Sequence, residues 1–344
     1  MSRHAAMRAA VYQEPGRLTI EERPIPRPGP HEVLIRISHC GVCGTDLHFV
    51  MDGWGRPGSI GGHEYSGVIS SVGSDVVGWV VGDAVVAGSD VGCGECRQCR
   101  NHRVSLCEAQ SDAAMAEYTG AFAEFKLVDA EQLHRIPSDL SLREAALAEP
   151  VAVSLHGITQ SGIRPGQRAL ITGAGPVGMF TLAALRAQGV EDVTVSEPSE
   201  VRRALAERIG ASRVIEPDEL IVPLLPFTIV DDPYDVAFEC SGKAAAIESA
   251  LAALAKTGTL CLMGTGVERP QFDAMRVLLN ELVVTGAYAY NEDGFARALE
   301  LIGSGSLPTD LLIAKNDIGL DELLQTMQQL VAGEVAGKVL VTPN

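Results

Sequence analysis

The stretch RALITGAGPVG, residues 168–178, decides the fold of this chain. An apolar run typical of a buried strand leads into three glycines spaced G-x-G-x-x-G, and a helical pattern continues to Gln188. The first glycine permits a tight turn, the second lets the backbone approach a pyrophosphate, and the third allows close helix–strand packing. The sequence therefore predicts a dinucleotide site with its phosphates at the helix N-terminus, rather than a generic tight turn. The expected contacts are Gly173, Gly175, Pro176, Val177 and Gly178.

Two further residues extend this predicted cofactor site. Glu197 lies nineteen residues after Gly178, at the end of the next predicted strand, where an acid bonds the adenosine ribose hydroxyls. A 2′-phosphate would place its charge against that carboxylate, so we expect NAD rather than NADP. Arg202, one turn into the following helix, is the second candidate contact. The alternative for Glu197 is a solvated surface acid.

The chain outside this turn falls into three parts. Residues 1–150 are β-rich, with short apolar or alternating runs broken by Pro and Gly. From about Gln160, strand and helix patterns alternate, which predicts a parallel, doubly wound sheet of the α/β class. The six expected strands are Arg168–Thr172, Val193–Glu197, Arg213–Ile215, Asp235–Glu239, Thr259–Met263 and Leu282–Thr285. The helical patterns between them are Val177–Gln188, Ser199–Ile209 and Ala244–Ala255. Residues 220–233 hold three prolines and no clear helical period, so we expect an irregular crossover there. Two helical patterns, Glu292–Ile302 and Leu320–Leu330, and a final strand, Lys338–Val341, complete the chain.

Composition narrows the classes of function. The 344 residues suggest two domains, and 46% of them are hydrophobic, enough for sizeable cores. With 27 basic and 44 acidic residues the net charge is −17, which disfavours nucleic acid and anionic membranes as partners. The longest uncharged stretch, Ala169–Leu185, has seventeen residues, short of the roughly 20 that a membrane span needs. The N-terminus has no apolar signal-like run, so we expect a cytoplasmic protein.

Half of the eight cysteines lie within fifteen residues, at Cys93, Cys96, Cys99 and Cys107. In a reducing location, such a cluster points to metal binding rather than to disulfides. Four thiolates at spacings of three, three and eight can surround Zn²⁺ tetrahedrally, and a complete set of four leaves no open position. The prediction is a structural zinc site, and the alternative is four unrelated buried cysteines.

A third group of residues has the composition of a catalytic zinc site. Its parts are Cys43-Gly-Thr45-Asp-Leu-His48, then Gly62-His63-Glu64, then Glu149-Pro150. Each part alone is weak, because Cys40 and Cys43 could form a redox pair and a lone His63 is more often structural. Together they supply Cys, His and carboxylate, the mixture found where a zinc ion keeps one position open for water or substrate.

These motifs together resemble the zinc-dependent medium-chain dehydrogenase/reductase family. The sequences GVCGTDLH (41–48), GGHEYSGVISSVGSDV (61–76), the four-cysteine loop and GAGPVG (173–178) occur here in the order typical of that family. The resemblance implies a β-rich, GroES-like catalytic domain into which a Rossmann domain is inserted. The implied boundaries are 1–153 and 288–344 for the catalytic domain and 154–287 for the Rossmann domain.

The resemblance also implies roles for single residues. Cys43 and His63 match the first two ligands of the catalytic zinc. Classical alcohol dehydrogenases have a second Cys where this chain has Glu149, and a Glu there resembles the sorbitol, threonine and butanediol dehydrogenase branch. In that branch Glu64 and Glu149 can both approach the metal, and the sequence leaves open which of them binds it directly.

The implied activity is reversible hydride transfer between a secondary alcohol or polyol and NAD, giving a ketone. Zinc would act as a Lewis acid, Thr45 would take the substrate's proton, and His48 would pass it to solvent. Two zinc ions per chain, a small-molecule substrate and a homodimer or homotetramer complete the expectation. The alternatives are an amino-alcohol substrate of the threonine type, or a zinc-scaffolded binding protein without turnover.

Overall fold

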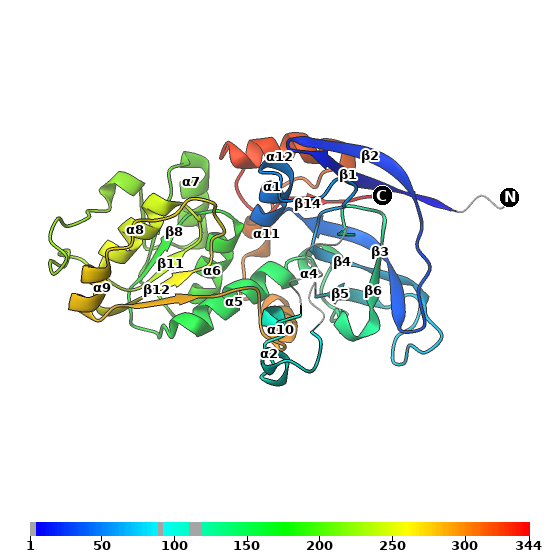
Figure 1. Cartoon of the computed structure of the whole chain (residues 1–344), viewed down its shortest axis with the longest axis horizontal. Coiled ribbons are helices and arrows are strands. Elements are labelled where there is room, and N and C mark those ends of the chain that lie inside the picture. Colours follow the sequence, from blue (N-terminus) through cyan, green and yellow to red (C-terminus); the bar gives the residue numbers. More distant parts are fainter. Residues whose placement is uncertain (1–4, 89–91, 110–117) are drawn as a thin grey trace.

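The computed structural model describes residues 5–88, 92–109 and 118–344. Two six-stranded sheets form the two ends of an elongated molecule, one built mainly from the first 140 residues and the other from the middle of the chain (Figure 1). No described helix is long and apolar enough to cross a membrane.

The second sheet is parallel throughout and has the strand order β10-β9-β8-β11-β12-β13. All six predicted strands are present, and the largest difference is that β12 begins five residues early. The strand order reverses between β8 and β11, which is where such sheets bind ligands at their carboxyl ends. The bounds are β8 Ala169–Thr172, β9 Val193–Ser196, β10 Arg213–Ile215, β11 Tyr234–Glu239, β12 Leu254–Leu262 and β13 Val283–Gly286.

Helices cover both faces of this sheet (Figure 1). Three of them lie where the helical periodicity predicts, namely α6 Pro176–Ala187, α7 Glu200–Ile209 and α8 Ala244–Ala252. Sequence analysis missed α5 Ala148–Ser161 and α9 Ala274–Asn280. Because α5 is buried on almost every side, it lacks the polar stripe that reveals an amphipathic helix. The crossover at 220–233 contains no helix or strand, as expected. A short 3₁₀ turn, Pro217–Glu219, ends just before it.

The other sheet is antiparallel, with the order β14-β3-β4-β5-β7, and β6 pairs with β3. Its last strand comes from the C-terminus, because Leu340 and Val341 pair with Gly41 and Cys40 of β3. A separate hairpin of β1 and β2 packs beside it. The bounds are β1 Ala6–Glu14, β2 Arg17–Pro24, β3 Glu32–Gly41, β4 Glu64–Val72, β5 Ala84–Ala87, β6 Phe125–Asp129, β7 Leu133–Arg135 and β14 Leu340–Val341.

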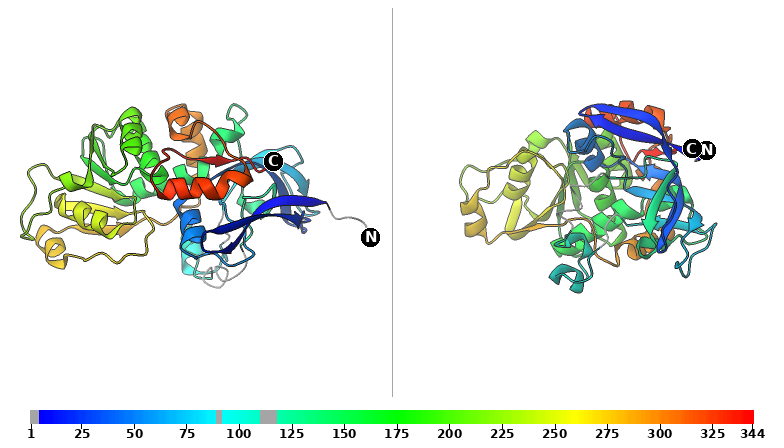
Figure 2. Two further views of the ribbon diagram at one scale, coloured as in Figure 1. Left: turned by 90° about the horizontal axis from the view of Figure 1, so that it is seen from above. Right: turned by 45° about the vertical axis from the view of Figure 1, so that its right-hand side comes forward.

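The C-terminal segment packs against the N-terminal sheet through apolar and polar contacts. Its helices are α10 Gly294–Gly303, α11 Thr309–Leu312 and α12 Leu323–Val331. Helix α12 lies beside the β1–β2 hairpin and buries Leu323, Met327 and Leu330 in the same core as Met7 and Val11 (Figure 2). The pattern Leu320–Leu330 was therefore correctly predicted as helical, with its first turn a 3₁₀ helix.

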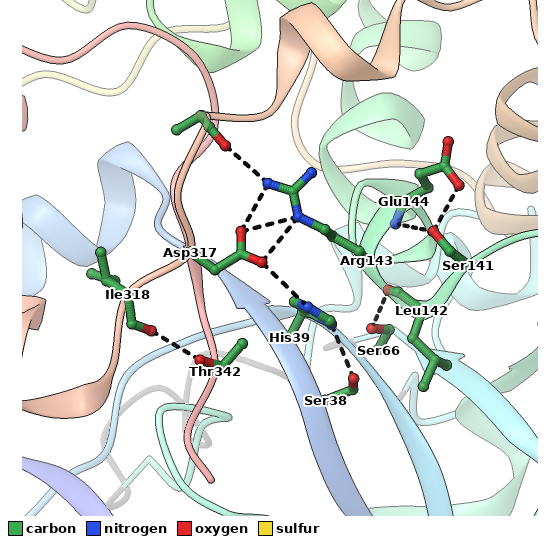
Figure 3. Close-up of polar contacts among 11 residues, drawn as sticks. Ser38, His39, Ser66, Ser141, Leu142, Arg143, Glu144, Asp317, Ile318 and Thr342 are labelled. Atoms are coloured by element: carbon green, nitrogen blue, oxygen red, sulfur yellow. Dashed lines mark hydrogen bonds and ion pairs between the residues drawn. The ribbon is translucent and has the colours of Figure 1, made fainter.

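A polar network joins the same two segments (Figure 3). Arg143, in the short helix α4 Leu142–Ala145, donates from Nε and Nη2 to the Asp317 carboxylate at 2.9 Å and also to the Ala314 carbonyl. The other side of Asp317 faces His39 of β3, 3.6 Å away. Burial lowers the pKa of His39, and Asp317 only partly opposes that effect. The network fixes the C-terminal loop against β3, close to the strand end that carries the site described next.

Candidate active site

Cys43, His63 and Glu64 are brought together at one end of β3 and β4. One ligand atom from each lies within 4.8 Å of the others. Cys43 is the N-cap of helix α1, Gly44–Met51, and His63 and Glu64 stand at the start of β4. A thiolate, an imidazole and a carboxylate form a ligand set that suits Zn²⁺. The sequence prediction of these three residues as neighbours thus agrees with the geometry.

Asp46 supports this cluster and was missed by sequence analysis. Its carboxylate is buried, accepts the backbone N–H of Cys43 at 3.0 Å and that of Gly62 at 2.9 Å, and lies 3.7 Å from Nδ1 of His63. Asp46 therefore fixes the two chain segments that carry Cys43 and His63. It also faces Nδ1 of His63, where a carboxylate can orient the imidazole ring of a metal ligand. The signal available in the sequence was an acid at the third helical position after Cys43, a capping-box spacing.

The Glu64 carboxylate is held by Lys338, the second residue that sequence analysis missed. Both side chains are 1% exposed, and Nζ of Lys338 lies 2.7 Å from Oε1 and 2.5 Å from Oε2 of Glu64. Lys338 also donates to the Val42 carbonyl at 3.0 Å. Gly41 leaves room for the pair, because a Cβ there would lie 2.2 Å from Oε2 of Glu64. The chain's C-terminal strand thus reaches into the site and orients one of its carboxylates.

Glu149 lies near the cluster without being part of it. It is buried in the first turn of α5, and its charge acts on both His63 and Lys338. Burial alone would lower the pKa of His63, but Asp46, Cys43 and Glu149 outweigh burial and hold it well above its usual value. Negative groups therefore converge on His63 from several elements, and such a site favours a bound cation.

The four-cysteine loop also gathers its ligand atoms. One Sγ from each of Cys93, Cys96, Cys99 and Cys107 lies within 4.8 Å of the others. Backbone N–H groups donate to three of these sulfurs at 3.3–3.4 Å, which stabilises thiolates. The N–H groups of Cys99 and Glu108 lower the pKa of Cys96 to about 6. Burial raises the pKa of Cys99 to about 12, so in the metal-free loop Cys96 and Cys99 titrate unequally. The arrangement fits a closed zinc site.

Thr45 and His48 both lie on α1, which sits where the two halves of the molecule meet (Figure 1). Thr45 is exposed in the first turn of α1. His48 contacts Asp52 on one side and the backbone carbonyl of Thr265 on the other. Since Thr265 follows β12, this contact joins the helix that carries Cys43 to the parallel sheet.

The glycine turn has the shape that the sequence predicts for a phosphate cradle. Gly173 has φ +95°, and a Cβ there would lie 2.9 Å from the Ser241 side chain. A Cβ at Gly178 would lie 2.0 Å from the Gly173 carbonyl, so helix and strand approach each other closely. Gly175, the N-cap of α6, meets nothing within 4 Å, which leaves its backbone open. The helix then begins with Pro176 and Val177.

Glu197 closes this turn from the next strand. It is 4% exposed, and its carboxylate accepts the backbone N–H of Ala174 at 2.7 Å and that of Ser199 at 2.9 Å. It is therefore not the solvated surface acid that the alternative supposed. Arg202 points elsewhere, because its guanidinium donates to the carbonyls of Leu330 and Val335. Arg202 could make its predicted contact with the cofactor only if its guanidinium gave up these two hydrogen bonds.

Comparison with known proteins identifies the family. Residues 29–138 match the alcohol dehydrogenase GroES-like domain, and residues 176–304 match the zinc-binding dehydrogenase family. Sorbitol dehydrogenase of Bacillus subtilis (strain 168) is 32% identical over 348 residues, covering 98% of both chains. The chain belongs to the zinc-dependent medium-chain dehydrogenase family. The predicted fold, a Rossmann-type parallel sheet joined to a GroES-like domain, is thereby confirmed.

Two further similarities indicate the kind of enzyme and the cofactors of this dehydrogenase. A probable D-xylulose reductase A of Aspergillus fumigatus is 31% identical, over 91% of this chain and 90% of that protein. A zinc-binding dehydrogenase of Sinorhizobium meliloti, whose crystal structure holds NADP, is 30% identical with a TM-score of 0.86 and covers 98% and 100% of the two chains. The chain is thus an oxidoreductase that uses zinc and a nicotinamide cofactor.

Replacing Lys338 with Met is expected to lower the free energy of unfolding by about 3–5 kcal/mol, because the Glu64 charge is left buried without its partner. Glu64→Gln in the same chain should recover more than about 1 kcal/mol of that loss, since the unpaired charge is removed. Urea unfolding of the single and double variants of the metal-free chain measures both values.

The matched control is Glu14→Gln, which breaks the exposed Arg17–Glu14 pair, and it should change stability by less than about 0.5 kcal/mol. Additive effects of the Lys338 and Glu64 substitutions would contradict the pairing.

Proposed function

We propose that this dehydrogenase oxidises a secondary alcohol or polyol to a ketone with NAD⁺, reversibly. The observation that carries the proposal is the cluster of Cys43, His63 and Glu64 with Glu149 beside it. Two relatives that cover more than nine-tenths of this chain are named for sorbitol and D-xylulose, a polyol and a ketose. No observation in the described residues favours an amino-alcohol substrate or a role without turnover.

The residues that would hold the catalytic zinc are Cys43, His63 and one carboxylate. Glu64 stands within the cluster, and both of its carboxylate oxygens also contact the Lys338 ammonium. Glu149 is the alternative third ligand. It would bind the zinc if Glu64 stays paired with Lys338 and does not bind the metal. Zinc bound there supplies a Lewis acid to the substrate oxygen, and the nicotinamide accepts the hydride.

The chain's own residues then handle the proton and the cofactor. The Thr45 hydroxyl takes the proton of the substrate hydroxyl, and His48 carries it toward solvent. The glycine turn holds the pyrophosphate at the N-terminus of α6, and Glu197 stiffens that turn from β9. The two sheets belong to separate domains, for which we propose the boundaries 1–153 with 288–344, and 154–287.

Assembly and location extend the proposal. Among the described strands only β12 pairs with β13, and near that edge Met275, Leu278, Leu279 and Val283 are exposed. An uncovered apolar edge favours association with a second copy, so we propose a homodimer or homotetramer. Light scattering should give two or four times the 36.3 kDa of one chain. A particle with the mass of one chain would contradict the proposed oligomer.

All eight cysteines are free, which supports a reducing, cytoplasmic location.

The activity is tested by the absorbance of the reduced cofactor on a panel of polyols, secondary diols, simple secondary alcohols and threonine. We expect the highest kcat/KM with a polyol or secondary diol. Cys43→Ser should lower kcat about 100-fold or more, because it removes a metal ligand, while NADH affinity measured by fluorescence stays within about threefold. A threonine preference, or near wild-type turnover in the Cys43 variant, would refute the proposal.

Metal content tests the proposed count of two zinc ions per chain. Cys96→Ser or Cys107→Ser should lose one ion of the two and lower the thermal midpoint, because the binding energy of a closed site is folding energy. Cys240→Ala is the control, since Cys240 lies outside both clusters, and it should keep both ions. A wild-type chain that holds a single zinc, with the four-cysteine loop empty, would disprove the structural site.

The choice of cofactor follows from Glu197. A 2′-phosphate near a buried carboxylate costs enough that NAD⁺ should exceed NADP⁺ in kcat/KM by about ten- to a hundredfold. Glu197→Gln should narrow that ratio because it removes the charge, whereas Glu200→Gln, an exposed acid in the next helix turn, should leave it unchanged. Equal or better efficiency with NADP⁺ in the wild type would show that Glu197 does not read the ribose.

A further inference from the structure

His48 faces hydrogen-bond acceptors with both of its ring nitrogens. Nδ1 lies 2.6 Å from Oδ2 of Asp52, and Nε2 lies 3.2 Å from the carbonyl oxygen of Thr265. A carboxylate and a carbonyl have no proton to give, whereas a neutral imidazole has a single N–H. Both hydrogen bonds therefore exist together only when His48 is an imidazolium cation.

The groups around the ring favour that cation. Trp54 stacks on the imidazole with 4.6 Å between the ring centroids and 18° between the planes, an arrangement that stabilises a positive charge. His48 also lies in the last turn of α1, where the helix dipole is negative. The charged group that faces the ring is Asp52. Thr265 contributes a neutral carbonyl and Trp54 an uncharged indole.

The two hydrogen bonds are unequal, and this decides which proton leaves. The bond to Asp52 is short and has an ionised acceptor, so it is the stronger one. When His48 loses a proton, the remaining proton stays on Nδ1. Nε2 then presents a bare lone pair to the carbonyl of Thr265, and this contact opens. Asp52 thus selects one tautomer and leaves Nε2 as the basic atom.

Helical spacing aligns Asp52 with the predicted relay. Thr45 and His48 lie on α1 and Asp52 is its C-cap, and their spacings of three and four residues place them along one face of the helix. Thr45 lies nearest to Cys43, and Asp52 is 45% exposed in its side chain at the other end of the helix. The line runs from the candidate metal cluster to solvent.

We propose, resting on the function proposed above, that Asp52 is the positioning residue of the proton relay. It holds neutral His48 with its proton on Nδ1, so that Nε2 accepts the substrate's hydroxyl proton through the Thr45 hydroxyl. The imidazolium that results donates from Nε2 to Thr265 and joins α1 to the loop after β12. Loss of one proton to solvent restores the neutral ring and opens that contact. One proton enters and one leaves in each turnover.

The first test follows the ring itself by ¹⁵N NMR of the histidine-labelled, zinc-loaded chain, with His48→Gln to assign the signal. Neutral His48 should carry its proton on Nδ1. Asp52→Ala should mix the two tautomers, and Asp52→Asn should mix them less, because its amide oxygen still accepts a hydrogen bond from Nδ1. Asp75→Asn, at the exposed His31–Asp75 pair, removes the same charge elsewhere and should leave His48 unchanged.

The second test is the rate of turnover. In Asp52→Ala kcat should fall about tenfold with cofactor affinity unchanged, because part of the neutral His48 then carries its proton on Nε2 and cannot accept another there. A merely structural Asp52 would leave the tautomer of His48 unchanged in that variant. An unchanged tautomer in Asp52→Ala would overturn the inference even in an active enzyme. A normal His48 response without turnover on any alcohol would instead refute the proposed function, and the relay with it.

Discussion

The buried ion pair between Lys338 and Glu64 is the contact on which the rest of the site depends. It brings the last strand of the chain against β3 and β4, beside Cys43 and His63. Burying two charges is favourable only when they neutralise each other and their remaining hydrogen-bonding capacity is met, and here the lysine ammonium donates a further hydrogen bond to the Val42 carbonyl. The C-terminal residues therefore complete the catalytic sheet rather than merely following it.

From that pair outward, the site is built by segments that are far apart in the sequence. Asp46 ties the start of α1 to the turn before β4, and the network around Asp317 ties the C-terminal loop to β3 (Figure 3). Helix α5 delivers Glu149 from the boundary between the two halves. Each contact restricts a segment that carries a candidate ligand, so the ligands are held in place by the fold before any metal binds.

The link through His48 gives this arrangement a dynamic aspect. The helix that begins at Cys43 also contacts the loop after β12, so a polar contact through His48 joins the metal side to the nucleotide side. A bond that needs a protonated ring responds to proton transfer, whereas the apolar cores of the two halves do not. The contact through His48 can therefore change during turnover while the apolar cores stay packed.

Much of this could be predicted from the sequence because local pattern carries it. The glycine spacing at 173–178, the alternation of strands and helices and the cysteine spacing at 93–107 each reflect short-range geometry, and the parallel sheet followed them closely. The family resemblance placed Cys43 and His63 in one site. Helix α5 escaped notice because a helix buried on almost every side lacks the polar stripe of an amphipathic helix.

Only the tertiary structure decided how those residues are supported. Nothing local marks Lys338 as a partner of a glutamate 274 positions away, or Thr265 as the acceptor that faces His48. Nor could spacing reveal that Glu197 is already bonded to the glycine turn and that Arg202 points to the C-terminal helix. The physical reason is that periodicity and motif spacing describe the chain along its length, whereas charge pairing depends on which distant segments the packed cores bring within 3 Å or so of each other.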